Sequence, residues 1–421
     1  MAELESLLKR AEKETDQAEL YFEKTDSILL KSVLDRIESS DSTFHNGYSL
    51  RVIKNGRLGF SYFTSPDEFG RALKDAVHSS KFSPKIDPSF SPKKTFNEVS
   101  GVYSKKLINK SEDELSDSLL QMVDVIKRTK ATPIQSFVSR SESISKMINS
   151  EGGRFEKKET GFEVSSIAQF RESTSSDFKV SREFFETDKI AENAADYAVK
   201  FSGGRPVSGE FDIIIHPSTV VSLLSKILLP SVDGEEIFRK NSYLHGRLGQ
   251  EICPDYLTFW DDPLLPKGIE SSKCDDEGAV SCKKPIVRKG KLSTYLCDME
   301  TSFQAKMKNT GNGFRGSFVM PPTIEQTNFV VESGQKTKLE EIKGVLVYDV
   351  LAVHNANTLN GDFALEVYSG AMFDGEIKKA IRSCSIVGNF FELLKNVRMA
   401  DDFQNYGFYY GPSWIYRGKI V

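Results

Sequence analysis

The chain has 421 residues, a formal net charge of −4 at neutral pH, 39% hydrophobic residues and 28% charged residues. This length exceeds that of one ordinary hydrophobic core, so we expect two domains of a soluble globular protein. The net charge gives no general attraction to nucleic acid, and no apolar run approaches the roughly 18 residues of a membrane span, so we expect no nucleic-acid or membrane partner. The N-terminus is charged and amphipathic, unlike a signal peptide, so we expect a cytoplasmic protein.

The N-terminal stretch is predicted to begin with a helix and a set of strands. Residues 3–13 carry their apolar side chains on one helical face. Extended runs follow at 18–24, 27–33, 48–54 and 57–63. Asn55-Gly56 favours a tight hairpin turn between the last two runs. A capping box with proline at the first helical position then starts a second helix at Ser65, and the Ser-, Pro- and Lys-rich residues 80–95 predict a connection over the surface.

The same order of elements then occurs again. Ser111 and Glu114 predict a capped helix, strand-like runs lie at 134–149 and near 161–171, and a shorter helix covers roughly 187–200. The repeated order of helix, strands and helix suggests an approximate internal duplication, although the two stretches share no sequence similarity. We place a domain boundary near residue 205, so that residues 1–205 form an α+β domain.

Residues 206–421 have a different character. The apolar run 211–217 predicts a strand buried on both faces, and a helix follows at 218–229. After Gly234, turn residues separate strand-like segments, of which 344–353, 363–373 and 378–388 are the clearest, with Asp374-Gly375 as the hairpin turn between the last two. We therefore predict a mostly antiparallel β domain with one buried helix, in the form of a curved or barrel-like sheet, and an α+β fold class for the whole chain.

The helix at 218–229 has two different faces. Its apolar face carries Val220, Leu223, Leu224, Ile227 and Leu228. The opposite face carries Ser218, Ser222, Ser225 and Lys226. The ammonium group of Lys226 could compensate nearby carboxylates, but a long side chain that reaches solvent is the more common arrangement.

Short motifs in a fixed order carry a family resemblance. They are NGRLGF at 55–60, GGRPVSGEFDIIIHP at 203–217, DDEG at 275–278, TGNG at 310–313 and IVGN at 386–389. Together they resemble the TldD/PmbA family, also called modulator of DNA gyrase. In the catalytic branch of that family, the helix after the His-Pro loop carries a metal-binding His-Glu-x-x-x-His motif. The matching positions here are Ser225, Lys226 and Pro230, none of which is a suitable metal ligand or general base.

The resemblance therefore implies the metal-free TldE/PmbA-like branch. The catalytic branch also uses a cysteine near the C-terminus as a ligand, whereas the last cysteine here is Cys384. We expect no catalytic residue, no bound metal and no cofactor in this chain. The side chains expected to face a cavity or a partner are Ser222, Ser225, Lys226, His216 and His354.

The remaining donor residues leave an alternative metal site open. No two of the five histidines have the spacing of i and i+4, but His216 and His354 both lie at predicted strand ends and could approach each other. Asp275, Asp276 and Glu277 could bind a hard cation, although a solvated loop is the more common outcome of such an acidic run. The five cysteines form no Cys-x-x-Cys pair, which favours buried thiols over disulfides or structural zinc.

Three functions follow from these features. The first is a non-catalytic subunit that pairs with a TldD-like metalloprotease subunit acting on peptides or unfolded polypeptides. The second is a stand-alone homodimer that binds an extended peptide at a strand edge without cleaving it. The third is an active hydrolase with a rebuilt metal site.

Overall fold

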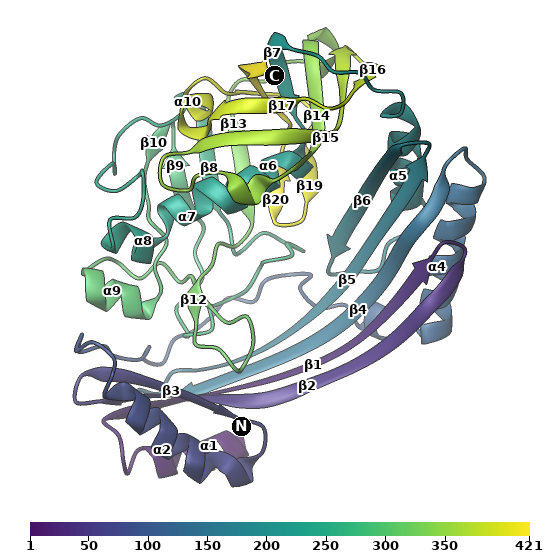
Figure 1. Cartoon of the computed structure of the whole chain (residues 1–421). Helices are drawn as coiled ribbons and strands as arrows, with labels where there is room; N and C mark the ends of the chain where they lie inside the picture. Colours follow the sequence, from purple (N-terminus) through teal and green to yellow (C-terminus); the bar gives the residue numbers. More distant parts are fainter.

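The computed structural model describes all 421 residues. Its largest element is a curved six-stranded antiparallel sheet that arches along one side of the molecule (Figure 1). The strands follow the order β3-β2-β1-β4-β5-β6, and they are β1 Gln17–Val33, β2 Arg36–Lys54, β3 Arg57–Phe63, β4 Thr132–Asn149, β5 Arg154–Phe170 and β6 Ser173–Ser181. Asn55 and Gly56 both have a positive φ, which confirms the predicted hairpin turn between β2 and β3.

Several of these strands are longer than predicted. The runs at 18–24 and 27–33 form the single strand β1, β2 begins 12 residues before the predicted 48, and β6 was not predicted at all. The first half of β2 was missed because residues 38–45 are mostly exposed and polar on both faces. Such a strand has no apolar alternation from which it could be recognised.

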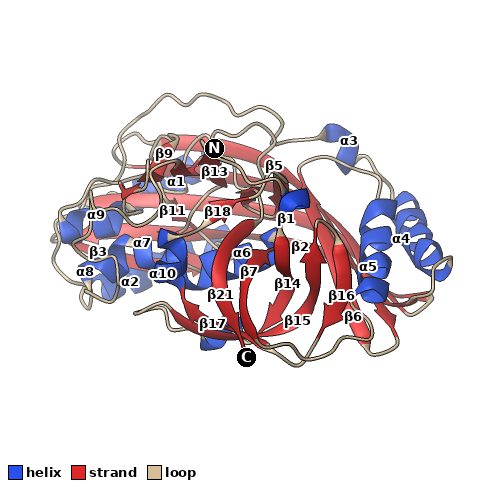
Figure 2. Ribbon diagram, turned by 90° about the horizontal axis from the view of Figure 1, so that it is seen from above, coloured by secondary structure: helices blue, strands red, loops and turns tan.

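Helices cover the two ends of this sheet (Figures 1 and 2). They are α1 Ala2–Ala11 and α2 Phe69–Ser80 at one end, and α3 Lys105–Ile108, α4 Glu112–Lys127 and α5 Asp188–Lys200 at the other. The capping box of Ser111 and Glu114 is present with both of its hydrogen bonds. The order helix, three antiparallel strands, helix occurs twice, and the two units meet where β1 pairs with β4, so the predicted duplication of element order is confirmed.

The second half of the chain contains a closed barrel. Its five strands are hydrogen-bonded in a ring, in the order β14 Lys343–Leu351, β7 Gly209–Ile215, β21 Trp414–Ile420, β17 Ser385–Asn389 and β15 Asp362–Asp374, with β15 pairing again with β14. This confirms the predicted barrel-like sheet. The predicted strand 378–388 is wrong, because β16 Ile377–Ile381 and β17 are separated by a turn in which Ser383 has a φ of 53°.

A second sheet packs beside the barrel. Its order is β10-β9-β8-β13-β20-β19, with β8 Leu257–Asp261, β9 Lys284–Arg288, β10 Lys291–Leu292, β13 Phe329–Ser333, β19 Gln404–Tyr406 and β20 Tyr409–Gly411. The short pair β11 Gly313–Phe314 and β12 Thr323–Ile324 lies apart from it, and β18 Arg398–Met399 pairs with β21. The prediction of a single helix was wrong, since α8 Gly234–Phe238, α9 Met299–Ala305 and α10 Phe390–Lys395 are also present. One core of 42 buried residues joins these elements.

The boundary near residue 205 stays a prediction. The long sheet ends at Ser181, α5 ends at Lys200, and β7 starts at Gly209. None of the helices is both long enough and apolar enough to cross a membrane.

Candidate functional site

The helix predicted at 218–229 extends from Pro217 to Val232. It consists of α6 Pro217–Leu223, a π-helical turn over Leu224–Leu228, and α7 Leu229–Val232. The predicted apolar face is confirmed, because Val220, Leu223, Leu224, Ile227 and Leu228 are all fully buried in the main core. Packing of this face fixes the helix in the core, and on the opposite face Ser225 lines a cavity.

The π turn changes which side chains lie together. Its hydrogen bonds join residues i and i+5, so residues five apart lie on the same side of the helix. In an α-helix of 3.6 residues per turn they would point in different directions. Ser225 and Pro230 are five apart and line the same cavity of about 300 Å³, which we call the helix cavity. Its other lining residues are Leu229, Asp233, Glu236, Leu296, Ile324, Glu325 and Gln326.

The donors around the helix cavity do not fit the metal site of the catalytic branch. Ser225 offers a weak neutral ligand and Pro230 has no donor atom. Asp233 is held by its role as a helix cap, since it accepts hydrogen bonds from the backbone N–H groups of Glu235 and Glu236. No group of three His, Cys, Asp or Glu side chains is arranged to hold a metal ion.

The other residues of this helix are placed differently. Lys226 is half-buried, forms no ion pair and does not line the helix cavity. Its carbonyl oxygen accepts a hydrogen bond from Thr358. Ser222 is half-buried and donates its hydroxyl to the carbonyl oxygen of Ser218. Cys384 is buried in the turn between β16 and β17, and burial raises the pKa of its thiol.

The two candidate histidines have unlike environments. His216 caps α6, because its Nδ1 accepts a hydrogen bond from the backbone N–H of Ser218, and its ring lies 4.4 Å from that of Tyr348. His354 is exposed in the short turn Val353–Asn355 that follows β14. Burial lowers the pKa of His216 to about 3, so its imidazole is neutral at physiological pH. His216 therefore stabilises the start of α6.

We expect His216 to make the protein less stable in mild acid. The unfolded chain takes up a proton on this residue below its ordinary pKa of about 6.5, whereas the folded chain does so only near pH 3, so stability falls as the pH drops between these values. His216→Asn keeps a capping oxygen and removes the titration. Between pH 7 and pH 5 the variant should lose about 1–2 kcal/mol less unfolding free energy than the native chain. Urea unfolding at both pH values measures this, with the exposed His354→Asn as control, and equal losses in native chain and His216 variant would contradict it.

The acidic motif 275–277 is buried, as the structural role that the family resemblance implies for it would require, and it is not a solvated loop. Asp275, Asp276 and Glu277 are 0%, 6% and 1% exposed. Asp275 accepts hydrogen bonds from three backbone N–H groups, those of Glu277, Ala279 and Gly313. Asp276 pairs with Lys157 at 2.6 Å, and Glu277 pairs with Arg51 at 2.5 Å. These partners occupy the three carboxylates, so the motif is structural and offers no cation site.

The same motif joins the two halves of the chain. Arg51 lies on β2 and pairs directly across the strands with Glu19 of β1, at 2.8 Å. Glu19 also contacts Arg315, which follows β11, at 2.8 Å. The network therefore connects the long sheet to the loops at 275–277 and 315 through two arginines and two glutamates. All four side chains are buried, which makes their mutual neutralisation necessary.

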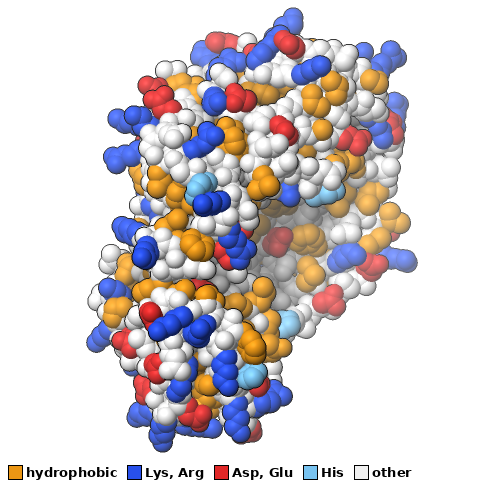
Figure 3. Space-filling view, turned by 60° about the vertical axis from the view of Figure 1, so that its left-hand side comes forward, with side chains coloured by type: hydrophobic (Ala, Val, Ile, Leu, Met, Phe, Trp, Pro, Cys, Tyr) orange, Lys and Arg blue, Asp and Glu red, His pale blue; other side chains and the backbone are white.

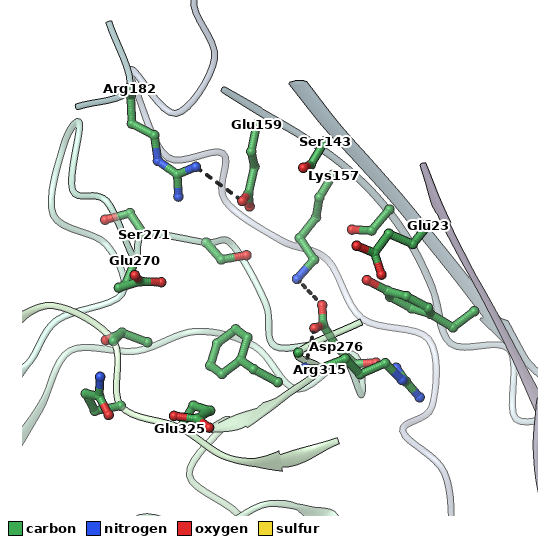
Figure 4. Close-up of a pocket in the computed structure, with 17 residues that line it drawn as sticks. Glu23, Ser143, Lys157, Glu159, Arg182, Glu270, Ser271, Asp276, Arg315 and Glu325 are labelled. Atoms are coloured by element: carbon green, nitrogen blue, oxygen red, sulfur yellow. Dashed lines mark hydrogen bonds and ion pairs between the residues drawn. The ribbon is translucent and has the colours of Figure 1, made fainter. Parts of the chain in front are cut away.

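A second cavity, the sheet cavity, lies between the long sheet and these loops (Figure 4). Its volume is about 380 Å³ and only two of its 17 lining residues are hydrophobic. They include Tyr21, Glu23, Ser143, Ser145, Lys157, Glu159, Arg182, Glu270, Asp276, Arg315 and Glu325. Glu325 and Gln326 line both the sheet cavity and the helix cavity, so the two adjoin. A space-filling view shows a deep hollow on one face, with acidic and apolar side chains inside it (Figure 3).

Apart from Asp276, the residues of the sheet cavity were not predicted as site residues. Strand β5 begins at Arg154, seven residues before the predicted start near 161, and this missed part carries Lys157 and Glu159. Phe155 and Lys157 are buried while their neighbours are more exposed. An alternation of this kind is a strand signal, but a lysine at an inward position hides it, because buried lysines are rare.

Comparisons with known proteins agree with this architecture. Residues 208–419 match the family model described as PmbA/TldA metallopeptidase C-terminal domain, and residues 18–80 match PmbA/TldA metallopeptidase domain 1. An uncharacterized protein of Methanocaldococcus jannaschii is 28% identical over the full length of both chains. A protein of Haemophilus influenzae named metalloprotease PmbA homolog is 23% identical, over 92% of this chain and 88% of its own length.

Two solved structures share the complete fold. TldE from Thermococcus kodakarensis superposes with a TM-score of 0.91 at 22% identity over 100% of both chains. A protein of Thermotoga maritima described as a modulator of a DNA gyrase superposes with a TM-score of 0.90 at 21% identity, over 100% of this chain and 99% of its own. Together with the family match over half of the sequence, these findings show that the chain belongs to the PmbA/TldD family.

Proposed function

We propose that this chain is the non-catalytic, TldE/PmbA-like subunit of a cytoplasmic TldD-type metalloprotease that degrades or processes peptides. The observation that carries the proposal is the donor set of the helix cavity. Ser225 and Pro230 stand at the two positions that the π turn brings together, and neither can bind a metal ion strongly. The fold shared with TldE and the relatives named metalloprotease PmbA homolog support the family context.

Lys226, which lies between these two residues in the sequence, also supports a non-catalytic role. Metal-assisted peptide cleavage needs a Lewis acid and a general base that are held together. In the catalytic branch the base is a glutamate, and its matching position here is Lys226. A charged ammonium group has three donors and no acceptor, so it cannot take a proton from water. The chemistry therefore belongs to the partner subunit.

We expect no peptide hydrolysis by this chain alone, and chelator-sensitive hydrolysis once a TldD-like partner is added. The release of fluorescent fragments from an unfolded, labelled polypeptide measures this. In the mixture, glutamate-to-glutamine replacement in the partner's metal helix should abolish cleavage, whereas Lys226→Ala in this chain should leave it nearly unchanged. Chelator-sensitive cleavage by this chain alone would overturn the proposal and favour a rebuilt metal site.

Two further measurements separate the alternatives. A TldD-like protein that co-purifies with the chain favours the subunit, while a homodimer without such a partner favours a stand-alone peptide-binding protein. Elemental analysis of the purified chain tests the rebuilt site. One tightly held zinc ion per chain that survives dialysis would contradict the non-catalytic reading.

A further inference from the structure

Several polar atoms in the wall of the sheet cavity have no partner within the protein. Glu23 Oε2 and Arg315 Nε are two of only eight buried side-chain polar atoms in the whole chain without a hydrogen bond. Lys157 is 8% exposed and donates two hydrogen bonds, to Asp276 and to the carbonyl oxygen of Cys274. An ammonium group has three donors, so one remains. Unpaired buried polar groups are rare in folded proteins, so two such atoms and the remaining donor of Lys157 in one cavity wall point to a ligand.

The charges in this wall are not balanced. Its three cations already have carboxylate partners: Lys157 pairs with Asp276, Arg182 with Glu159 and Arg315 with Glu19. Glu23, Glu270 and Glu325 line the same cavity and form no ion pair. Burial raises the pKa of all three, and the charge of Asp276 raises that of Glu23 further. The cavity therefore holds more carboxylates than cations, and a cation bound there would stabilise the charged forms of these carboxylates.

We propose that the sheet cavity binds a basic segment of a polypeptide. Lysine or arginine side chains of the segment would meet the three carboxylates, and a backbone carbonyl oxygen would accept a hydrogen bond from the free donor of Lys157. The volume of about 380 Å³ lies within the usual range of ligand sites. Because Glu325 and Gln326 also line the helix cavity, a bound segment can continue from one cavity into the other. The inference rests on the proposed function and names basic polypeptides as the class that the subunit binds.

The test uses the isolated full chain, without partner or metal. A fluorescein-labelled nine-residue peptide with three lysines is titrated with the protein, and its anisotropy is compared with that of the same peptide with glutamine in place of lysine. The lysine peptide should bind at least tenfold more tightly. The double variant Glu270→Gln/Glu325→Gln should weaken this binding at least tenfold. Neither carboxylate forms a hydrogen bond or ion pair within the protein, so the variant removes no internal contact and should fold. The control is Glu151→Gln/Glu210→Gln, which removes two exposed, unpaired carboxylates elsewhere and should change nothing.

Each result has a definite meaning. Equal binding of the two peptides, or unchanged binding by the Glu270/Glu325 variant, would overturn the proposal. Displacement of the lysine peptide by spermidine at equal concentration would replace it with a site for free polyamines. The outcome is independent of catalysis, because a chain that cleaves peptides on its own would overturn the subunit assignment and leave the binding result intact.

Discussion

Replacing Arg51 by leucine should lower the free energy of unfolding by about 3–5 kcal/mol, because it leaves the buried carboxylate of Glu277 without a cation and that of Glu19 with Arg315 alone. Arg51 bridges Glu19 and Glu277, at 2.8 Å and 2.5 Å, and all three side chains are at most 3% exposed. Removing one member of a buried ion network lowers the free energy of unfolding more than replacing all of its members by apolar residues does. Urea unfolding followed by circular dichroism measures the loss.

Two comparison variants make this result specific. Arg71→Leu removes an arginine whose side chain is 70% exposed and pairs with Glu68 at 3.4 Å, and it should cost less than about 1 kcal/mol. Adding Glu277→Gln to Arg51→Leu should recover part of the lost stability, because the uncompensated charge of Glu277 disappears while Glu19 keeps its pair with Arg315. A loss for Arg51→Leu no larger than that for Arg71→Leu would show that the network does not hold the two halves together.

Replacing Trp414 by alanine should also cost about 3–5 kcal/mol. Trp414 lies on the barrel strand β21 and is fully buried. Its ring centroid lies 5.9 Å from that of Phe259, and its Nε1 donates a hydrogen bond to the hydroxyl oxygen of Tyr409 at 3.0 Å. The variant leaves a large cavity in the main core and removes one of the two hydrogen bonds of the Tyr409 hydroxyl, which still donates to the carbonyl oxygen of Pro412.

The only other tryptophan is a matched control. Trp260 lies on β8, is half-buried, and donates to Glu332 at the surface. Trp260→Ala should cost clearly less than Trp414→Ala, because the site stays open to water. Since both variants lose one indole, differential scanning calorimetry is a better measurement than fluorescence. Equal shifts of the two melting temperatures would contradict the central position of Trp414.

Local signals in the sequence predicted local structure. Asn55-Gly56 and the Ser111 capping box each concern residues within a few positions of one another, and both are confirmed. The role of the acidic motif was not predictable in this way, because Arg51 is 226 residues from Glu277 and Lys157 is 119 residues from Asp276. A run of three acidic residues in a sequence is typical of a solvated loop, and only the folded chain places Lys157 beside Asp276 and Arg51 beside Glu277. The helix position was predicted, while its π turn has no recognisable local signal.

The π turn also determines how the length of this helix can vary. Deleting one residue from Leu224–Leu228 would give an ordinary α-helical turn, and the following segment would keep its orientation, because five residues of a π-helix turn about as far as four residues of an α-helix. Leu229 and Val232 would then stay in the core, where both are buried. Ser225 and Pro230 would become four residues apart, a spacing that an α-helix also places on one face. The helix can therefore gain or lose one residue at this turn while the packing on both sides of it is kept.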